Sequence, residues 1–145
     1  MDRKNLVRTA LVGTILFVTG VAGAGQIKQA IKIIGVAAVV DRFGGDINKE
    51  LNKLTGHEDT SKSYTKVVPI LTVGLRSRGA IGAAQVMGSK ANVEKVRAVA
   101  SPEIEFLGEV HIRALIPIST TDVTDAKKLK VVDGVGVSGI VDLKV

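Results

Sequence analysis

The chain has 145 residues, of which 46% are hydrophobic and none is cysteine, so one domain of ordinary size can form a core, but disulfides, thiolate zinc sites and cysteine nucleophiles are excluded. Aromatic residues are scarce (three Phe, one Tyr and no Trp), which leaves little for a surface that stacks nucleic-acid bases. The net charge of +6 is spread thinly along the chain, which is typical of a solvated surface rather than of a nucleic-acid site.

The N-terminal part of the chain contains a long uncharged stretch. Residues 9–27, TALVGTILFVTGVAGAGQI, carry no charged side chain, and a helix needs about 20 apolar residues to cross a bilayer. Small side chains recur there at four-residue spacing, a pattern that lets two helix backbones approach closely in lipid. We therefore predict a membrane-spanning helix whose association face comprises Thr19, Gly20, Gly23 and Ala24. The compact basic cluster in residues 1–8 leads us to expect the N-terminus in the cytoplasm.

Two other interpretations of this stretch stay open. A basic start, an apolar run and the sequence Ala22-Gly23-Ala24 also follow the order of a secretory signal peptide, with cleavage after Ala24. The mature chain would then be a secreted domain that binds a ligand or a lipid. The third interpretation is a helix buried in a soluble protein or assembly, which the glycines disfavour because each costs a helix in water about 1 kcal/mol relative to Ala.

The next segment predicts two short helical parts and a linker. Residues 25–40 continue the apolar run, with two lysines on one face, as an amphipathic helix would. The sequence FGGD at 43–46 interrupts it. Asp46 is then expected to cap a short helix that buries Ile47, Leu51 and Leu54, and Gly56 to end it. Since 56–63 are polar, we predict an anchor and amphipathic helix (1–42), a short helix with a linker (43–63) and a globular domain (64–145).

From Tyr64 the hydrophobic period changes to two, which indicates strands. We predict strands over 66–76 and 79–88, a helix over 90–100 capped by Ser89, and strands over 103–106 and 109–119. A connection with one helical turn and a last strand follow. The order ββαββ predicts an α+β fold with one antiparallel sheet and a helix on one face. Pro69 and Pro117 are expected at edges or bulges because proline lacks a ladder donor.

One glycine motif near the C-terminus is literally that of dinucleotide-binding folds. Gly134, Gly136 and Gly139 form G-x-G-x-x-G, which in those folds ends a strand and opens a helix. Only six residues follow Gly139, and they alternate as a strand. Without a helix N-terminus to hold a pyrophosphate, we do not expect a nucleotide to bind.

The histidines and a C-terminal serine form no complete site in the sequence. Residues His57-Glu58-Asp59 are adjacent in a polar linker, and such neighbours seldom converge on one metal ion. His111 lies on the polar face of a predicted strand, so it is expected at a surface or an interface. Ser138 lacks the nucleophile-elbow sequence and a nearby base.

Three carboxylates, Glu103, Glu105 and Glu109, form a small acidic cluster, and the first two lie on one strand face. Paired carboxylates can perform acid–base chemistry. A solvated edge, or ion pairs with Arg76, Arg78 or Arg97, is the simpler explanation.

These patterns together predict a non-catalytic, membrane-anchored structural or interaction subunit. It would assemble with itself or with a larger membrane complex, with membrane lipid as a further partner. We expect no catalytic residue, cofactor or metal, and no nucleic acid. A secreted ligand-binding or lipid-binding domain is the alternative.

Overall fold

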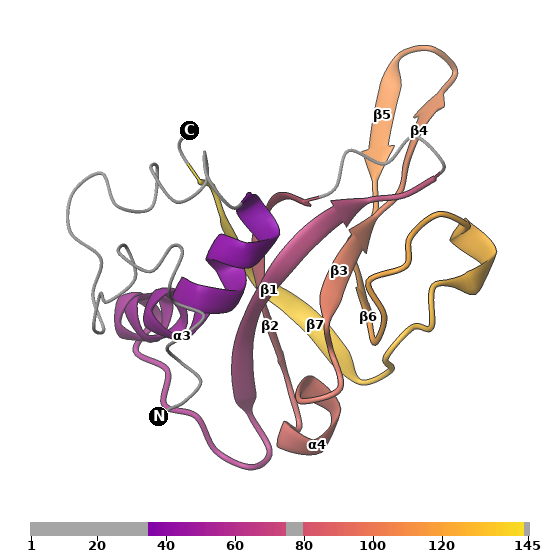
Figure 1. Cartoon of the computed structure of the whole chain (residues 1–145). Coiled ribbons are helices and arrows are strands. Elements are labelled where there is room, and N and C mark those ends of the chain that lie inside the picture. Colours follow the sequence, from indigo (N-terminus) through magenta and orange to yellow (C-terminus); the bar gives the residue numbers. More distant parts are fainter. Residues whose placement is uncertain (1–34, 75–79, 144–145) are drawn as a thin grey trace, which may run out of the picture.

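Figure 1 shows a computed structural model of the chain, which describes residues 35–74 and 80–143. The elements in chain order are α3 (Val36–Thr55), β1 (Tyr64–Thr72), β2 (Ala80–Gly88), α4 (Lys90–Val93), β3 (Ala98–Ser101), β4 (Glu103–Phe106), β5 (Val110–Arg113), β6 (Ile116–Ile118), the 3-10 turn η2 (Ala126–Lys128) and β7 (Val135–Val141). The described part of the protein is therefore α+β, as the sequence predicts.

The predicted transmembrane helix and its association face, Thr19, Gly20, Gly23 and Ala24, lie outside the described residues. Within 35–74 and 80–143, no helix combines the length and the apolar character that a bilayer crossing requires.

The main sheet has five strands in the order β6-β3-β1-β2-β7, and β4 and β5 form a separate two-stranded sheet. Neighbouring strands are antiparallel except β1 and β3, which are parallel. The prediction of a purely antiparallel ββαββ sheet is wrong. The chain leaves β2, turns through α4 and comes back on the other side of β1, so β3 runs in the same direction as β1 (Figure 1).

Helix α3 is one continuous helix through the segment that was predicted to break it. Gly44 and Gly45 lie inside it, and a Cβ on Gly44 would lie 3.3 Å from the backbone oxygen of Val67. The missing side chain lets α3 approach β1 closely, so packing outweighs the low helix propensity of glycine. The predicted boundary between residues 42 and 43 therefore falls inside α3. Gly56 ends the helix in the left-handed conformation, as predicted.

Helix α3 covers one face of the sheet (Figure 1). The side chains buried in this contact are Val40, Val67 and Ala83. Ile47 and Leu51 pack against them, whereas Leu54, predicted to share their face, is 82% exposed. The other face of the sheet carries the largest core cluster: Val68, Ile70, Ala84, Val86, Val93, Val96, Val99 and Val132.

The helix predicted over 90–100 is limited to the single turn α4. Ser89 begins it as predicted, with its side chain accepting a hydrogen bond from the Asn92 amide. Residues 98–101 form β3 instead, and all four are buried. Burial between strands outweighs the helical spacing of these small and β-branched side chains.

The two prolines lie differently from each other. Pro117 is in β6, a three-residue strand at the edge of the sheet, as predicted. Pro69 is in β1, the central strand, so it is not at an edge, although the register of β1 with β2 shifts close by, between Ile70 and Leu71. Strand β3 pairs only with residues 70–72 of β1, so the amide that Pro69 lacks removes no hydrogen bond to β3.

Strands β3, β4, β5 and β6 belong to one long hairpin. Ala100 faces Ile116 in its inner half and Glu103 faces Arg113 in its outer half, which keeps a single register. The Ala114 amide donates to the Pro102 oxygen at 3.0 Å across the junction. The inner half belongs to the main sheet, while the outer half, β4 and β5, projects from the body of the molecule (Figure 1).

Candidate functional site

The projecting hairpin β4–β5 has one apolar and one charged face. Strand alternation places the pairs Ile104–Ile112 and Phe106–Val110 on one side, and Glu103–Arg113 and Glu105–His111 on the other. All eight of these residues are exposed. A two-stranded hairpin alone is at best marginally stable in water, so an uncovered apolar face here requires an explanation.

The apolar face continues a strip that begins in the main sheet. By the same alternation, Ala98, Ala100 and Ile118 lie along the inner part of this strip, where Val123 and Leu129 of the following connection bury them. No described residue buries its outer part in the same way. The strands predicted over 103–106 and 109–119 are thus found, the second as β5 and β6. Of the alternating apolar residues along 104–118, Ile118 is buried and Ile116 half-buried, whereas the other five are exposed.

The uncovered part is large for a chain of this size. Ile104 is 61% exposed, Phe106 52% and the tip residue Leu107 77%, and Val110 and Ile112 are also exposed. Together they expose about as much as three whole side chains, on the order of 500 Å². Monomeric proteins seldom expose larger contiguous apolar patches, and patches of this size are often functional.

The tip of the hairpin is held in an unusual backbone conformation. Leu107 and Gly108 both have positive φ, 55° and 69°, and the Glu109 amide donates to the Phe106 oxygen. Such a primed turn suits the twist of a hairpin, but its first position favours Gly, Asn or Asp. A bulky leucine there is strained, which is common where a side chain serves binding rather than stability.

The charged face is organised around His111. Its Nδ1 lies 2.5 Å from a Glu105 oxygen and its Nε2 2.9 Å from a Glu103 oxygen, while Arg113 lies 3.5 Å from the other Glu103 oxygen. Sequence reasoning placed His111 at a surface but found no residue across from it, whereas the register places Glu105 there. Among the described residues, these carboxylates pair with His111 and Arg113 rather than with Arg97.

The two carboxylates raise the pKa of His111 above its usual value of 6.5. The hydrogen bond from the imidazole to Glu105 is the largest cause, and the charges of Glu105 and Glu103 act in the same direction. With a carboxylate oxygen at each ring nitrogen, the doubly protonated imidazolium is the form that satisfies both contacts. The imidazole of His111 on β5 therefore links this strand to Glu103 and Glu105 on β4.

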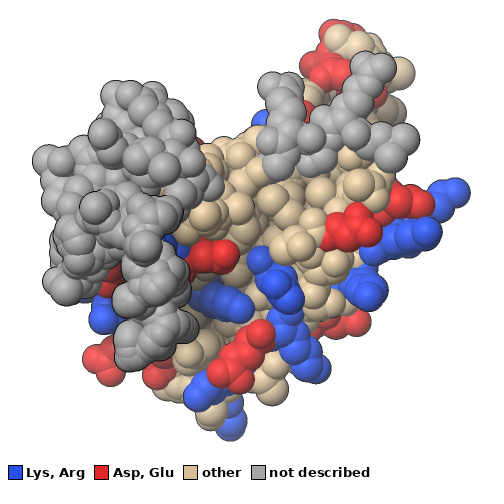
Figure 2. Space-filling view, viewed as in Figure 1, with Lys and Arg blue, Asp and Glu red and all other residues tan. Residues whose placement is uncertain are grey.

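The hairpin and the rest of the chain carry opposite charge. With His111 counted neutral, residues 103–113 contain three carboxylates and one arginine, a net charge of −2, and a protonated His111 makes it −1. The rest of the chain carries +8, of which +7 belongs to residues 1–34, 75–79 and 144–145. Figure 2 shows acidic side chains near the hairpin tip and many of the basic ones on the body below it. The projecting surface is therefore apolar on one side and acidic overall.

A second cluster is polar and buried beneath α3. The Asn48 and Asn52 amides both donate to the Thr65 hydroxyl at 3.0 Å, and Gln85 donates to both of their oxygens at 2.9 Å. The Thr65 hydroxyl donates to Asp59 at 2.7 Å. Every side-chain group of this cluster is matched to another, so it orients α3 on the sheet rather than offering a free ligand.

Sequence reasoning missed this polar cluster. Two signals were available: a glutamine inside the apolar strand sequence GAIGAAQVMG, and two asparagines spaced four residues apart on one helix. Gln85 and Thr65 are almost fully buried. The structure also places Ser138 here, with its hydroxyl donating to Gln85 at 2.8 Å.

The linker residues join the same cluster. The His57 Nε2 lies 3.3 Å from Asp59 and 3.1 Å from the backbone oxygen of Ser63, so the loop 57–63 is tied to itself and, through Asp59, to β1. Among the described residues, no group of three His, Asp or Glu side chains is arranged to hold a metal ion. Gly134 lies in a turn and Gly136 and Gly139 in β7, in agreement with the expectation that they form a strand.

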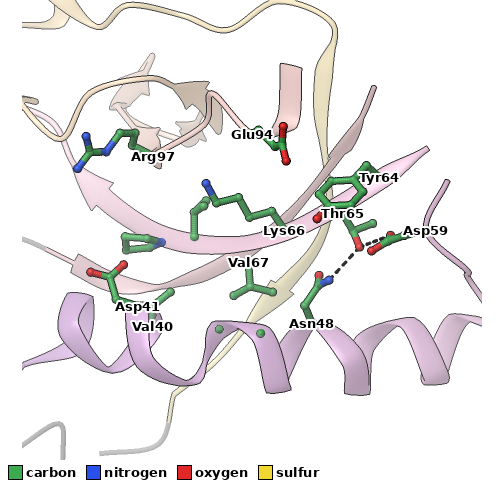
Figure 3. A pocket seen from close by; sticks show the side chains of 14 residues that line it. Val40, Asp41, Asn48, Asp59, Tyr64, Thr65, Lys66, Val67, Glu94 and Arg97 are labelled. Carbon is green, nitrogen blue, oxygen red and sulfur yellow. Dashed lines mark hydrogen bonds between the residues drawn. The ribbon is translucent and has the colours of Figure 1, made fainter. Parts of the chain in front are cut away.

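A cavity of about 660 Å³ lies between α3 and the part of β1 that β3 does not pair with (Figure 3). Its charged lining residues are Asp41, Asp59, Lys66, Glu94 and Arg97. The Lys66 amine donates to the Val96 oxygen at 2.7 Å, and burial, with Arg97 as the second cause, lowers its pKa. Because charges of both signs are interspersed, the cavity favours no single class of ligand.

Comparisons of the chain with protein-family models, with curated proteins and with solved structures found no match.

Proposed function

We propose that this protein is a non-catalytic interaction subunit that a membrane anchor holds at a bilayer and that contacts its partner protein through the β4–β5 hairpin. The observation that carries the proposal is the uncovered apolar face of Ile104, Phe106, Val110 and Ile112 on a projecting hairpin. A surface of this kind costs free energy in water and is stabilised when another surface covers it.

The proposal that the chain has no catalytic role is supported by how its reactive side chains are used. The Ser138 hydroxyl donates to Gln85, and His111 is held between two carboxylates. The Ser138 hydroxyl therefore faces an amide rather than a base, and both ring nitrogens of His111 face carboxylates.

The hairpin part of the proposal is tested by complex size. Extract the protein from its native membranes in mild detergent and compare the wild type with Phe106→Ser. We expect a smaller complex for Phe106→Ser, because a polar side chain at this position weakens the contact. Ile140→Ser is the matched control, since Ile140 is similarly exposed, on β7. An unchanged complex in both variants would refute the hairpin as the contact surface.

The anchor part rests on the uncharged run 9–27. Native membranes washed with alkaline carbonate should keep the protein, since an apolar helix of that length partitions into the bilayer. Release into the supernatant would contradict anchoring.

The second candidate is a secreted binding domain, and the cavity between α3 and β1 is the observation that favours it. It requires cleavage after Ala24, so the N-terminal mass of the native protein separates the two functions. A mature chain that starts at Gly25 would support the second.

A further inference from the structure

The geometry of the hairpin points to a second copy of this chain as its partner, and we propose that two copies pack their β4–β5 apolar faces against each other, antiparallel, about a two-fold axis. This deepens the proposed function by naming the partner, and it rests on that function only in taking the hairpin as the contact surface.

The apolar face has the right composition to pair with itself. Its two cross-strand pairs, Ile104–Ile112 and Phe106–Val110, form adjacent rows of similar size. We place the two-fold axis in the interface, perpendicular to the strands and midway between these two rows. Rotation about it brings the Ile104–Ile112 row of one copy against the Phe106–Val110 row of the other. Ile104 of each copy then lies opposite Phe106 of the other, and a large aromatic side chain meets a branched aliphatic one rather than its own image.

The area is sufficient for a specific contact. Each copy contributes on the order of 500 Å² of apolar surface, so the pair buries about 1,000 Å² in all, the size at which specific interfaces begin. The charged faces with Glu103, Glu105, His111 and Arg113 point outward in this arrangement. No charge is therefore buried without a partner.

Charge selects the antiparallel arrangement over a tip-to-tip one. Antiparallel packing places the tip of each hairpin, with Glu109, beside the base of the other hairpin, whereas an arrangement with both tips at the same end would bring the two Glu109 side chains together. Leu107 of each copy then lies beside the base of the partner hairpin.

The acidic character of the hairpin also argues against a lipid surface as the occupant of this face. Glu109 at the tip would approach the anionic headgroups of a membrane, where like charges repel, although Glu103 and Glu105 lie on the opposite face. A second copy would cover the apolar side chains without placing the tip carboxylate against anionic headgroups.

The test uses the absence of native cysteine from the full chain. Purify Ile104→Cys and Phe106→Cys separately in mild detergent, mix them and add a short bismaleimide, which links two thiols across the roughly 10 Å between packed sheet faces. We expect the mixture to form a cross-linked heterodimer at least about tenfold faster than either variant forms its own dimer, because the contact holds these two positions together at high effective concentration. Ile112→Cys mixed with Val110→Cys should behave in the same way.

Glu105→Cys is the matched control. It lies on the same hairpin but on the charged face, so it should cross-link no faster than Ile81→Cys, which lies on β2. These positions are already exposed in the monomer, so the substitutions leave the fold intact, which an unchanged circular dichroism melting curve verifies.

The outcomes separate this inference from the proposed function. If the Ile104/Phe106 mixture reacts no faster than the control, the second copy is not the partner, and the inference fails. If Phe106→Ser still shrinks the native complex, the proposed function stands with a different protein on this face. If the native complex is also unchanged, both fail. A photo-cross-linker at Phe106 that labels only lipid in native membranes would likewise overturn both.

Discussion

Among single residues, Thr65 joins α3, the linker loop and the sheet through one buried hydroxyl. One hydroxyl accepts from two asparagine amides and donates to Asp59, and it lies between α3 and the sheet. A buried polar group without a partner destabilises the fold by more free energy than its hydrogen bond contributes. Any shift of α3 along the sheet would break these bonds, so the cluster favours the observed position of α3 over shifted ones.

Thr65→Val tests this role. The substitution keeps the shape of the side chain but leaves two amides and a carboxylate without their shared partner, so we expect a loss of about 1–3 kcal/mol in stability. The measurement is thermal unfolding of the full chain in mild detergent. Thr124→Val is the control, since Thr124 is exposed and bonds only within its own loop, and should change stability by about 0.5 kcal/mol or less. Equal effects of the two variants would contradict the role of Thr65.

His111 predicts a pH dependence of the hairpin. Its pKa is raised in the folded protein, so its stabilising contacts with Glu103 and Glu105 are fully present below about pH 6.5, the unfolded value. They are lost as pH rises through the higher folded pKa. An NMR titration should find the His111 ring pKa above 6.5, and Glu105→Gln should lower it. An unchanged ring pKa in Glu105→Gln would show that the carboxylate does not act on the ring.

Among the elements, helix α3 packs closely on strand β1 because a glycine lies at the contact. Gly44 touches β1, while a Cβ on the adjacent Gly45 would meet no atom within 4 Å. The two glycines are neighbours in the same helix, so they have the same cost in helix propensity and differ only in their tertiary surroundings.

This difference gives opposite expectations for the two positions. Gly45→Ala should stabilise the protein by about 0.5–1 kcal/mol, because alanine favours the helix and meets nothing. Gly44→Val should destabilise it by about 1–3 kcal/mol, because the added methyl groups push α3 away from Val67. Urea unfolding of the full-length variants compares them. Two changes of the same sign would mean that the close approach of α3 to β1 is not required.

In the whole molecule, α3 and the strands share one core. α3 covers Val67 and Ala83 and supplies the amides that satisfy Thr65 and Gln85. The predicted division into residues 1–42, 43–63 and 64–145 separates these partners. A fragment that begins after the linker would expose both the apolar and the polar side of this contact.

We therefore expect residues 35–145 to unfold cooperatively, and residues 64–145 to melt at a lower temperature or not to fold at all. The physical reason is the loss of apolar burial together with unpaired buried groups. Circular dichroism melting of the two fragments gives the comparison. A fragment 64–145 as stable as 35–145 would show instead that the sheet needs no cover from α3.

Local structure follows from the sequence alone. The strands predicted over 66–76, 79–88, 103–106 and 109–119 are found, with shifted ends and the last divided into β5 and β6. Ser89 and Gly56 mark helix ends, and the two faces of the outer hairpin follow from period two. These features depend on residues close in the chain, whose backbone geometry the side chains set directly.

What covers each face of the strands depends on contacts between distant segments, which only the tertiary structure shows. The parallel pairing of β1 with β3, the strand at 98–101 in place of a helix, and the burial of Gly44 against Val67 all depend on segments that are distant in the sequence. The same holds for the hairpin, whose apolar strip is uniform in sequence. Only its inner part is covered, because the connection with Val123 and Leu129 packs there and leaves Ile104 and Phe106 exposed.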